Sequence, residues 1–293
     1  MSKAHPIIAV TGASGSGRSV VRDAVRKVCD RQGLNPAYVD GESFHKYNRA
    51  EMKVAQDKAV RAGEPLLTHF GPDANLWEEQ KQFFKKYGDS GTGRHRRYLH
   101  TQEEADAYGD GTVGPGQFTP CKDIPTNTDF MLYEGLHGAV KTNDVDIESL
   151  VDLRIGVVPV VNLEWTQKLL RDVNQRGYSQ DEVMNAILGR MGDYVRYVIP
   201  QFHHSHINFQ KVAVVDTSNP LVARDIPTDS ECLFVIRFRD PKDPKVPVDF
   251  PYLVDKIPNA KMSRRNTLVI PGGEFGLALE LIMPPILNVL LRG

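Results

Sequence analysis

The sequence predicts an α/β protein with a mixed, largely parallel sheet and helices on both faces. Segments rich in branched apolar residues alternate with segments of helical periodicity along the chain, and this alternation is typical of parallel sheets. The first apolar segment runs into the glycine-rich stretch AVTGASGSGRSVV, which begins at Ala9 and continues as a helical pattern. A chain of 293 residues suits one large domain of this class or two small ones.

The first half of the chain is expected to contain three strands and two helices. Each strand is an apolar run that ends in glycine or acidic residues, and each helix has apolar residues three and four apart. Glycine-rich loops are expected at 87–100 and 109–128. The expected strands are 5–12, 36–44 and 129–140, and the expected helices are 18–31 and 75–87.

The second half repeats the alternation and ends in an apolar helix. Two helices are expected within 162–202, split at Gly177, and the last helix begins at Phe275. A proline-rich connection occupies 240–251. The expected strands are 151–161, 211–218, 232–240 and 266–271. Because parallel sheets bind ligands beyond the carboxyl ends of their strands, the polar residues at those ends are the candidate site.

Composition excludes several classes of function. The formal net charge of −1 gives no overall field that favours nucleic acid or an anionic membrane. Cys29, Cys121 and Cys232 lie far apart, which disfavours a disulfide framework or zinc site and suits a reducing compartment. No apolar run approaches the ~18 residues of a membrane span, and the first residues lack the apolar core of a signal peptide. We therefore expect a cytoplasmic protein without nucleic-acid or membrane partners.

The stretch from Gly12 to Ser19 is nearly a phosphate-binding loop. Its glycines free the backbone so that successive N–H groups can point at one anion, and the following helix adds its positive end. Ser19 stands where such loops place the hydroxyl that ligates Mg²⁺, but Arg18 stands where the pattern has lysine. A dinucleotide site, with Asp40 on the ribose, and a plain glycine turn are the alternatives.

Acidic residues end two of the expected strands beside this loop. Asp40 and Glu42 lie at the end of the second strand, where a carboxylate could take a proton from an attacking hydroxyl. Glu134 ends the third strand and suits a metal held through oxygen ligands. His45 and Arg49 are four residues apart, so on a helix they would share a face and could grip a phosphorylated substrate. Solvated capping residues are the alternative for these acids.

Cationic residues gather in two further places. The loop at 94–100 carries several arginines, a residue type that recognises phosphate well. Lys168 and Arg171 share a helix face, and Arg176 follows just before Gly177. Three cations near a glycine break resemble a lid that closes over phosphates. A solvated surface helix, with Asp172 among the cations, is the alternative.

Together these pieces resemble phosphoribulokinase, and its bacterial branch in particular. The similarity covers almost the whole chain, and ordered matches of this number are more specific than a phosphate loop. They are TGASGSG, SFHKYNRAEM, YGDSGTGRHRRYLH, YEGLHG, VVPVVNLEWTQKLLRD, PQFHHSHINFQ and VVDTSNP. The resemblance implies one P-loop NTPase-like kinase domain over 1–293, with a lid near 164–180 and C-terminal strands and a helix.

The resemblance also implies a reaction, ATP-dependent phosphorylation of ribulose 5-phosphate at its 1-hydroxyl, with Mg²⁺. A homo-oligomer is expected because bacterial members are typically oligomeric. The implied catalytic residues are Glu42, Lys168 and Arg171, and the implied metal ligands are Ser19 and Glu134. The implied nucleotide-binding residues are Gly12, Ala13, Ser14, Gly15, Ser16, Gly17, Arg18, Ser19 and Arg176. The sugar-phosphate contacts are His45, Arg49, Lys53, Tyr98 and His100, and Arg97 joins them because the cluster favours an anionic substrate.

The chain departs from the family's pattern at two positions. The family usually reads E-G-D before S-F-H, whereas this chain has Asp40 and Glu42 in the opposite order. Arg18 is bulkier than the small residue that bacterial members commonly have. In the family the lysine that corresponds to Lys168 is thought to supply the missing cation, so Arg18 is expected to point outward or touch the β-phosphate. Another kinase of the superfamily, acting on uridine or pantothenate, and a weakly active nucleotide-binding regulatory paralogue are the alternatives.

Overall fold

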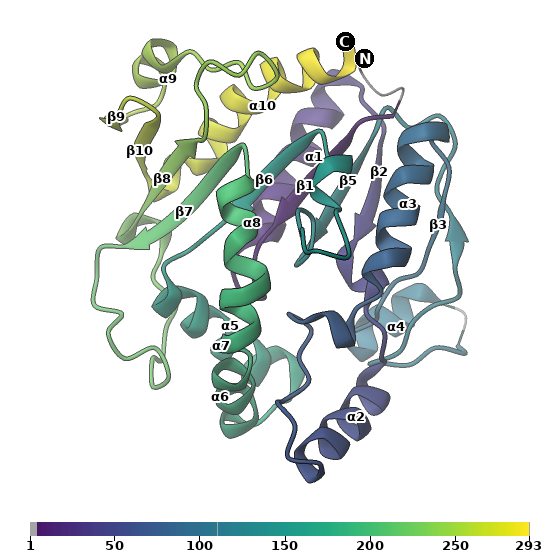
Figure 1. Ribbon diagram of the computed structural model, residues 1–293. Coiled ribbons are helices and arrows are strands. Elements are labelled where there is room, and N and C mark those ends of the chain that lie inside the picture. Colours follow the sequence, from purple (N-terminus) through teal and green to yellow (C-terminus); the bar gives the residue numbers. More distant parts are fainter. Residues whose placement is uncertain (1–4, 110, 293) are drawn as a thin grey trace.

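The computed structural model describes residues 5–109 and 111–292, and its centre is one eight-stranded sheet (Figure 1). The strand order is β2-β5-β1-β6-β7-β8-β10-β9. The first five strands are parallel, and β8, β10 and β9 then alternate in direction. The predicted mixed, largely parallel sheet is confirmed.

The bounds of the elements follow the predicted alternation. The sheet strands are β1 (Ile7–Thr11), β2 (Pro36–Asp40), β5 (Phe130–Gly135), β6 (Leu153–Val157), β7 (Ile207–Ala213), β8 (Cys232–Phe238), β9 (Lys261–Arg264) and β10 (Thr267–Pro271). Two short strands, β3 (Arg94–His95) and β4 (Lys122–Asp123), pair separately. The helices are α1 (Arg18–Gln32), α2 (Arg49–Arg61), α3 (Trp77–Ser90), α4 (Gln102–Tyr108), α5 (Val161–Arg176), α6 (Gln180–Gly189), α7 (Met191–Asp193), α8 (Ile199–His204), α9 (Phe250–Lys256) and α10 (Phe275–Arg292).

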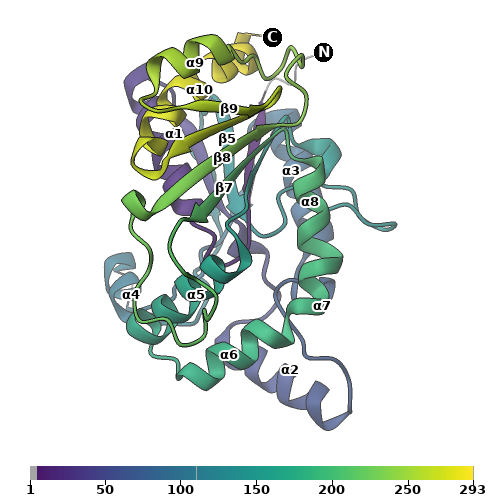
Figure 2. The same ribbon diagram turned by 90° about the vertical axis from the view of Figure 1, so that its left-hand side faces the viewer.

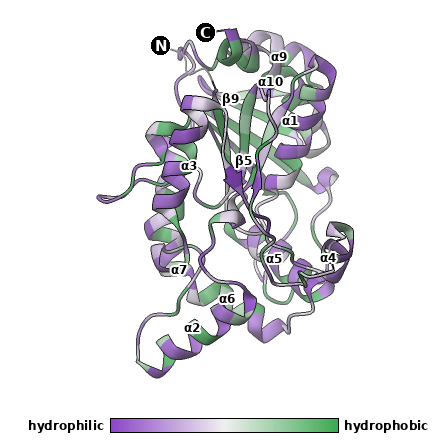
Figure 3. Ribbon diagram, turned by 90° about the vertical axis from the view of Figure 1, so that its right-hand side faces the viewer, coloured by the Kyte–Doolittle hydropathy of each residue, from purple (hydrophilic) through white to green (hydrophobic). Residues whose placement is uncertain are grey.

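Helices cover both faces of the sheet (Figure 2). α1 and α10 pack on one face, where Val25 and Leu279 join strand residues in the larger hydrophobic cluster. α3 covers the other face, and its Phe84 packs edge-on against Tyr133 of β5 at 5.2 Å between ring centroids. Figure 3 shows hydrophobic residues concentrated along the strands. α2 and α6 lie beyond the end of the sheet opposite to the chain termini (Figures 1 and 2).

α10 is a long apolar helix that packs in the core. By length and composition the segment Gly272–Arg292 could cross a membrane, with a mean hydropathy of 1.6, and it is the one such segment in the described residues. The sequence expectation considered uninterrupted apolar runs, which Glu280 breaks here, and it therefore did not anticipate this segment. However, Ala278, Leu279 and Met283 are fully buried against α1 and the sheet, and core helices of soluble proteins pass the same test.

Several boundaries differ from those predicted. β7 ends at Ala213, because Val214 and Val215 are exposed and Asp216 accepts a turn hydrogen bond from Ser218. Gly177 does separate two helices, with φ +73°, but α6 is followed by α7, a π-helical turn and α8 rather than continuing to 202. Neither α2 nor α4 was predicted, since their exposed, charged faces leave only a weak apolar pattern.

The carboxyl ends of β2, β5 and β1 meet at one edge of the sheet. Asp40 pairs in register with Glu134, and Thr11 pairs with Gly135. At the end of β5, Gly135 touches Gly41, which directly follows β2, because a Cβ built on Gly41 would lie 2.7 Å from the Gly135 Cα and 2.4 Å from the Tyr133 hydroxyl. Glycine at these positions therefore allows the two chain segments to approach closely.

Gly41→Ala tests whether this close contact positions the strand ends. The new methyl group overlaps backbone, so the segment that carries Glu42 has to shift. We expect the free energy of unfolding to fall by about 1–3 kcal/mol, the usual cost of overpacking, as measured by urea denaturation.

The matched control is Gly276→Ala in α10, where a Cβ meets no atom within 4 Å. This variant should be neutral or slightly stabilising, since alanine favours a helix over glycine. Equal stability of the Gly41→Ala variant and wild type would contradict the contact.

Candidate active site

The glycine-rich loop between β1 and α1 forms a phosphate-sized cradle. Gly15 and Gly17 have φ of +95° and +88°, a region that favours glycine. Gly12 is equally constrained, because a Cβ there would lie 2.5 Å from the Ser16 Oγ and 2.6 Å from the Val157 carbonyl oxygen. The loop leads directly into α1, whose first N–H groups and positive end face the cradle.

Arg18 folds back over this loop instead of pointing outward. Its Cγ lies near Gly12, and its Nε is 3.7 Å from the Glu134 Oε1. The side chain is only 14% exposed, and its Nη1 is buried with no hydrogen-bond partner among the described residues. Of the two expected directions of Arg18, the outward one is wrong, because the carboxylates at the strand ends attract the guanidinium. Contact with the β-phosphate stays a prediction.

The three strand-end carboxylates have different partners. Asp40 accepts a hydrogen bond from the Glu42 N–H at 2.9 Å and caps the 3₁₀ turn Gly41–Phe44. Glu42 Oε2 lies 2.5 Å from the His100 Nε2. Glu134 accepts a hydrogen bond from Arg22 at 2.9 Å, in addition to its ion pair with Arg18. Only Glu42 therefore points toward the loop that carries His100.

Electrostatics separate the two acids of the D-G-E stretch. Burial opposes ionisation of Glu42, but the hydrogen bond and charge of His100 outweigh it and hold the pKa of this carboxyl well below its usual value. Loss of hydration and the negative charge of Glu42 raise the pKa of Asp40. Because the Asp40 side chain also reaches solvent, water moderates that shift. Glu42 is therefore the carboxylate of this pair that stays ionised.

His45 is a buried, neutral histidine. It is 6% exposed, and its ring stacks on that of His69 at 4.0 Å between centroids. Burial, with a smaller contribution from His69, lowers the pKa of His45 well below its usual value. His45 closes the 3₁₀ turn, whereas Arg49 begins α2, so the expected shared helix face does not exist. The two are separated because Asn48 caps α2 through a capping box.

Arg49, Tyr98 and His100 do lie together. Arg49 Nη2 donates to the His100 carbonyl at 2.7 Å, and the rings of Tyr98 and His100 are 4.9 Å apart. The Arg49 guanidinium also lies 5.8 Å from the ring of Tyr178, which follows α5. The expected sugar-phosphate residues on α2 and on the loop at 94–100, called the arginine loop below, thus converge next to the candidate lid at 164–180.

Two of the expected contacts lie at the margin of this group. Arg97 is exposed, and its main-chain N–H is held by Thr119 at 3.0 Å. Lys53 lies one turn beyond Arg49 and faces α6. Hydrogen bonds from Ser179 lower the pKa of Glu182 on α6, and the positive charge of Lys53 lowers it by a smaller amount. Arg97 is therefore not brought to Glu42, and Lys53 stands between α2 and α6.

α5 lies directly against the phosphate loop. A Cβ on Gly15 would be 3.0 Å from the Lys168 Cβ, and Arg171 Nη2 donates to the Ser14 Oγ at 2.8 Å. Lys168 itself is ion-paired with Asp172. Burial lowers the pKa of Lys168 to about 8. The helix is thus close enough for its cations to reach a nucleotide bound in the cradle.

Asp172 gathers all three cations of this helix. It contacts Lys168, Arg171 at 2.8 Å and Arg176 at 3.4 Å, and it is 3% exposed. The surface-helix alternative is therefore wrong, because a solvated face would leave Asp172 exposed. Its spacing of four from Lys168 and Arg176 was a signal available in the sequence.

Sequence reasoning missed Arg22, and it placed Arg96 only among the phosphate-recognising arginines of the loop at 94–100. Arg22 is four residues after Arg18, so helical periodicity places both on one face of the helix. In the structure that face contacts Glu134. Arg96 donates to the carbonyls of Ser43 at 3.1 Å and His45 at 2.6 Å, and its guanidinium lies 3.6 Å from the Phe118 ring. It fastens the arginine loop to the turn that carries Glu42, a long-range contact with no local pattern.

The loop residues fit a nucleotide phosphate and a divalent cation. The Ser16 Oγ and the Arg18 Nη1 are buried donors without partners in the described part of the chain, and phosphate oxygens would satisfy them. Ser19 and Glu134 offer oxygen ligands beside the loop, and Mg²⁺ usually takes few protein ligands and adds phosphates and water. No three His, Cys, Asp or Glu side chains among the described residues could hold a metal by themselves.

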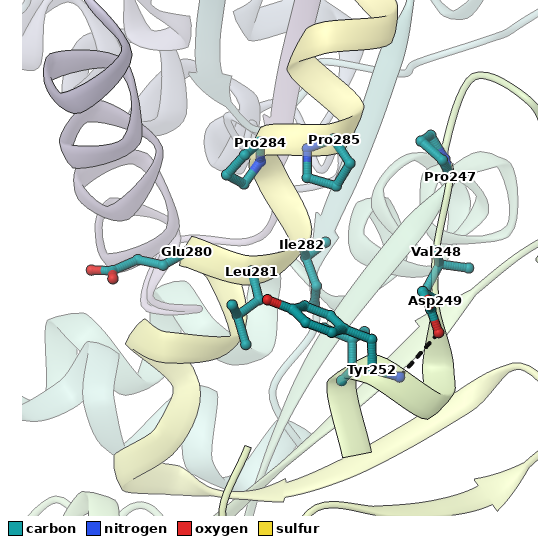
Figure 4. Close-up of a pocket in the computed structure, with 10 residues that line it drawn as sticks. Pro247, Val248, Asp249, Tyr252, Glu280, Leu281, Ile282, Pro284 and Pro285 are labelled. Carbon is teal, nitrogen blue, oxygen red and sulfur yellow. Dashed lines mark hydrogen bonds between the residues drawn. The ribbon is translucent and has the colours of Figure 1, made fainter. Parts of the chain in front are cut away.

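A separate hollow lies far from these residues. Its volume is about 530 Å³, and Tyr252 of α9 and Leu281, Pro284 and Pro285 of α10 line it (Figure 4). No phosphate-loop, strand-end or lid residue contributes to it. Its apolar wall and its distance from the carboxyl ends of the parallel strands separate it from the candidate active site.

Comparison with known proteins finds relatives that are similar over almost the whole chain. The model of the phosphoribulokinase / uridine kinase family matches residues 7–218. The chromosomal phosphoribulokinase of Cupriavidus necator is 48% identical over 285 residues, which cover 97% of this chain and 95% of the relative. A probable phosphoribulokinase of Escherichia coli is 46% identical over 293 residues, 100% of this chain and 99% of the relative. A solved phosphoribulokinase from Rhodobacter spheroides matches with a TM-score of 0.88 and 43% identity over 99% of each chain.

Neutral burial of histidine beside the site predicts a pH-dependent stability. His137 is 3% exposed, and burial lowers its pKa to about 4. The unfolded chain, with an ordinary histidine pKa near 6.5, therefore binds more protons below that pH, and the free energy of unfolding falls as pH drops from 6.5 toward 4. His137→Gln should reduce this slope by up to about 1.4 kcal/mol per pH unit, as measured by urea unfolding at pH 7 and pH 5.

The control is His203→Gln on α8, whose side chain is exposed. This variant should keep the wild-type slope. If both variants keep it, His137 is not buried as a neutral group.

Proposed function

This chain belongs to the phosphoribulokinase / uridine kinase family, and we propose that it transfers the γ-phosphoryl group of ATP to the 1-hydroxyl of ribulose 5-phosphate. The products are ribulose 1,5-bisphosphate and ADP. The observation that carries the proposal is the ionised Glu42 carboxylate beside a phosphate cradle, bonded to His100. The relatives named phosphoribulokinase, similar over nearly the full chain, favour this substrate over uridine or pantothenate.

We propose Glu42 as the base. Its carboxylate accepts the proton of the attacking hydroxyl as the oxygen–phosphorus bond forms. His100 orients this carboxylate through the 2.5 Å contact. The Asp40 carboxylate accepts a hydrogen bond from the Glu42 N–H and so holds the backbone from which the Glu42 side chain extends. A positioned base matters because a misplacement of ~1 Å can cost ~10²-fold in rate.

The sugar phosphate is held on the side of Glu42 that faces α2 and the loop at 94–100. Arg49 supplies the charged fork for the 5-phosphate, with Tyr98, His100 and Lys53 around it. His45 is neutral in this protein, so it offers a ring N–H or lone pair rather than a positive charge. Tyr178 lies over Arg49, which connects the sugar-phosphate pocket to the end of α5.

The residues from Gly12 to Ser19 hold the ATP phosphates, and Ser19 and Glu134 hold Mg²⁺. When bound, the metal neutralises charge on the transferred phosphoryl group. Segment 164–180 acts as the lid, and its Lys168, Arg171 and Arg176 face the phosphates. Since α5 already lies against Gly15, Lys168 has only to exchange Asp172 for a phosphate oxygen.

We further propose a cytoplasmic, homo-oligomeric enzyme without nucleic-acid or membrane partners. A net charge of −1 supports the absence of a polyanion-binding surface. The packing of α10 in the core supports the absence of a membrane anchor.

A substrate panel tests the reaction. Purified protein with Mg²⁺·ATP is offered ribulose 5-phosphate, other pentose phosphates, uridine and pantothenate, and ADP release is followed. Ribulose 5-phosphate should give the highest kcat/KM. Faster turnover of an uncharged nucleoside would reject the proposal, and nucleotide binding without any turnover would support a regulatory paralogue.

Glu42→Gln should lower kcat by ~10²–10⁴-fold, because glutamine keeps the shape but accepts no proton. The dissociation constant for ATP should change little. Rates under saturating substrates and ATP binding by calorimetry give the two values. Asp40→Asn is the matched comparison, since asparagine preserves the cap on the Glu42 N–H. If Asp40→Asn abolishes turnover and Glu42→Gln is mild, Asp40 is the base.

Lys168→Met should raise the activation free energy by ~3–4 kcal/mol, the size lost with one transition-state donor elsewhere. Arg18→Thr should cost less than ~1 kcal/mol at saturating Mg²⁺·ATP, since the arginine fork does not fit the space of a loop lysine. Steady-state rates of the two variants are compared. The reverse order would show that Arg18 has taken over the lysine's role.

A further inference from the structure

Both oxygens of the Glu134 carboxylate are engaged by arginines of one helix. Arg18 lies 3.7 Å from Oε1, and Arg22 donates to Oε2 at 2.9 Å. The two arginines are four residues apart on α1, so they present their charges on the same face. Glu134 is only 16% exposed, and water therefore screens these contacts incompletely. The carboxylate is neutralised from within the protein.

A divalent cation needs the same carboxylate oxygens. An arginine and a metal ion cannot lie against one oxygen at once, because both are positively charged and occupy the same space. The two arginines differ in what else they contact. Arg22 also bonds Asp23 at 2.9 Å and is 39% exposed, whereas the Arg18 Nη1 is buried and has no partner among the described residues.

We infer that Arg18 and Arg22 form an internal counter-cation for Glu134 that the divalent metal displaces when it binds with nucleotide. The unpartnered guanidinium nitrogen of Arg18 meets a nucleotide phosphate with or without the metal, and Arg22 keeps Asp23. The inference rests on the proposed function because it takes Glu134 as the acid beside the metal. It assigns Arg18 a dual effect, in which it strengthens binding of metal-free nucleotide and weakens binding of the metal.

The test compares two dissociation constants for each variant of the full chain. Calorimetry measures binding of the non-hydrolysable ATP analogue AMP-PNP with EDTA and again with Mg²⁺. The affinity of Mg²⁺ for free AMP-PNP is common to all variants, so a change in the ratio of the two constants reports a change in metal affinity at the site. Thermal unfolding confirms that each variant is folded.

Arg18→Thr should weaken metal-free AMP-PNP and raise the preference for the Mg²⁺ complex by up to about fivefold, the effect of losing one partly screened ion pair. Arg22→Thr should raise that preference while leaving metal-free AMP-PNP unchanged. Lys27→Thr is the matched control, since it removes one charge from an exposed position of the same helix. It should change neither constant.

A second set of variants distinguishes competition for Glu134 from simple charge repulsion between Arg18 and the metal, since both explanations predict a higher preference in Arg18→Thr. In a Glu134→Gln background, competition predicts that Arg18→Thr no longer changes the preference, whereas repulsion predicts the same increase as before. An unchanged preference in Arg18→Thr, or an equal increase in both backgrounds, overturns the inference. The measurement uses neither sugar phosphate nor turnover, so a different phosphoryl acceptor leaves it intact, whereas a wild-type chain that does not bind AMP-PNP overturns the proposed function as well.

Discussion

The site depends on the register of three parallel strands. β2, β5 and β1 end close together, with Asp40 paired to Glu134, and Gly41 touches Gly135 at the end of β5. This register brings carboxylates from two separate parts of the chain to the edge of the phosphate loop. Like charges this close raise the free energy of the folded state unless cations or protons balance them. Arg18, Arg22 and His100 supply that balance through their contacts with Glu134 and Glu42.

The balance is internal where the phosphate loop meets the strand ends and α5, because the cations there already have acidic partners. Arg18 and Arg22 face Glu134, His100 faces Glu42, and the cations of α5 share Asp172. Phosphates that enter therefore exchange one anionic partner for another instead of meeting bare charges. The net binding free energy is then the difference between two sets of ion pairs. Binding therefore depends on the geometry of the bound anion more than on its charge alone.

Local patterns predicted β1, the glycine loop, α1 and the strand-end acids, because each is encoded within a few neighbouring residues. They did not predict the direction of Arg18, which depends on Glu134 more than a hundred residues away. The same holds for Arg96, whose partners Ser43 and His45 belong to another loop. The supposed helix through His45 and Arg49 failed because a cap at Asn48 starts α2 later. Contacts between distant segments carry no periodic signal in one sequence.

The exchange of acids at Asp40 and Glu42 has a physical rationale in side-chain length. A short carboxylate suits the cap of the 3₁₀ turn, since Asp40 reaches the N–H two residues ahead at 2.9 Å. The longer Glu42 leaves that turn and meets His100 on the arginine loop, which Arg96 fastens to the same turn. The proposed base thus gains its position from two loops instead of one. A longer arm is compatible with an accurate site because its far end, and not only its backbone, is held.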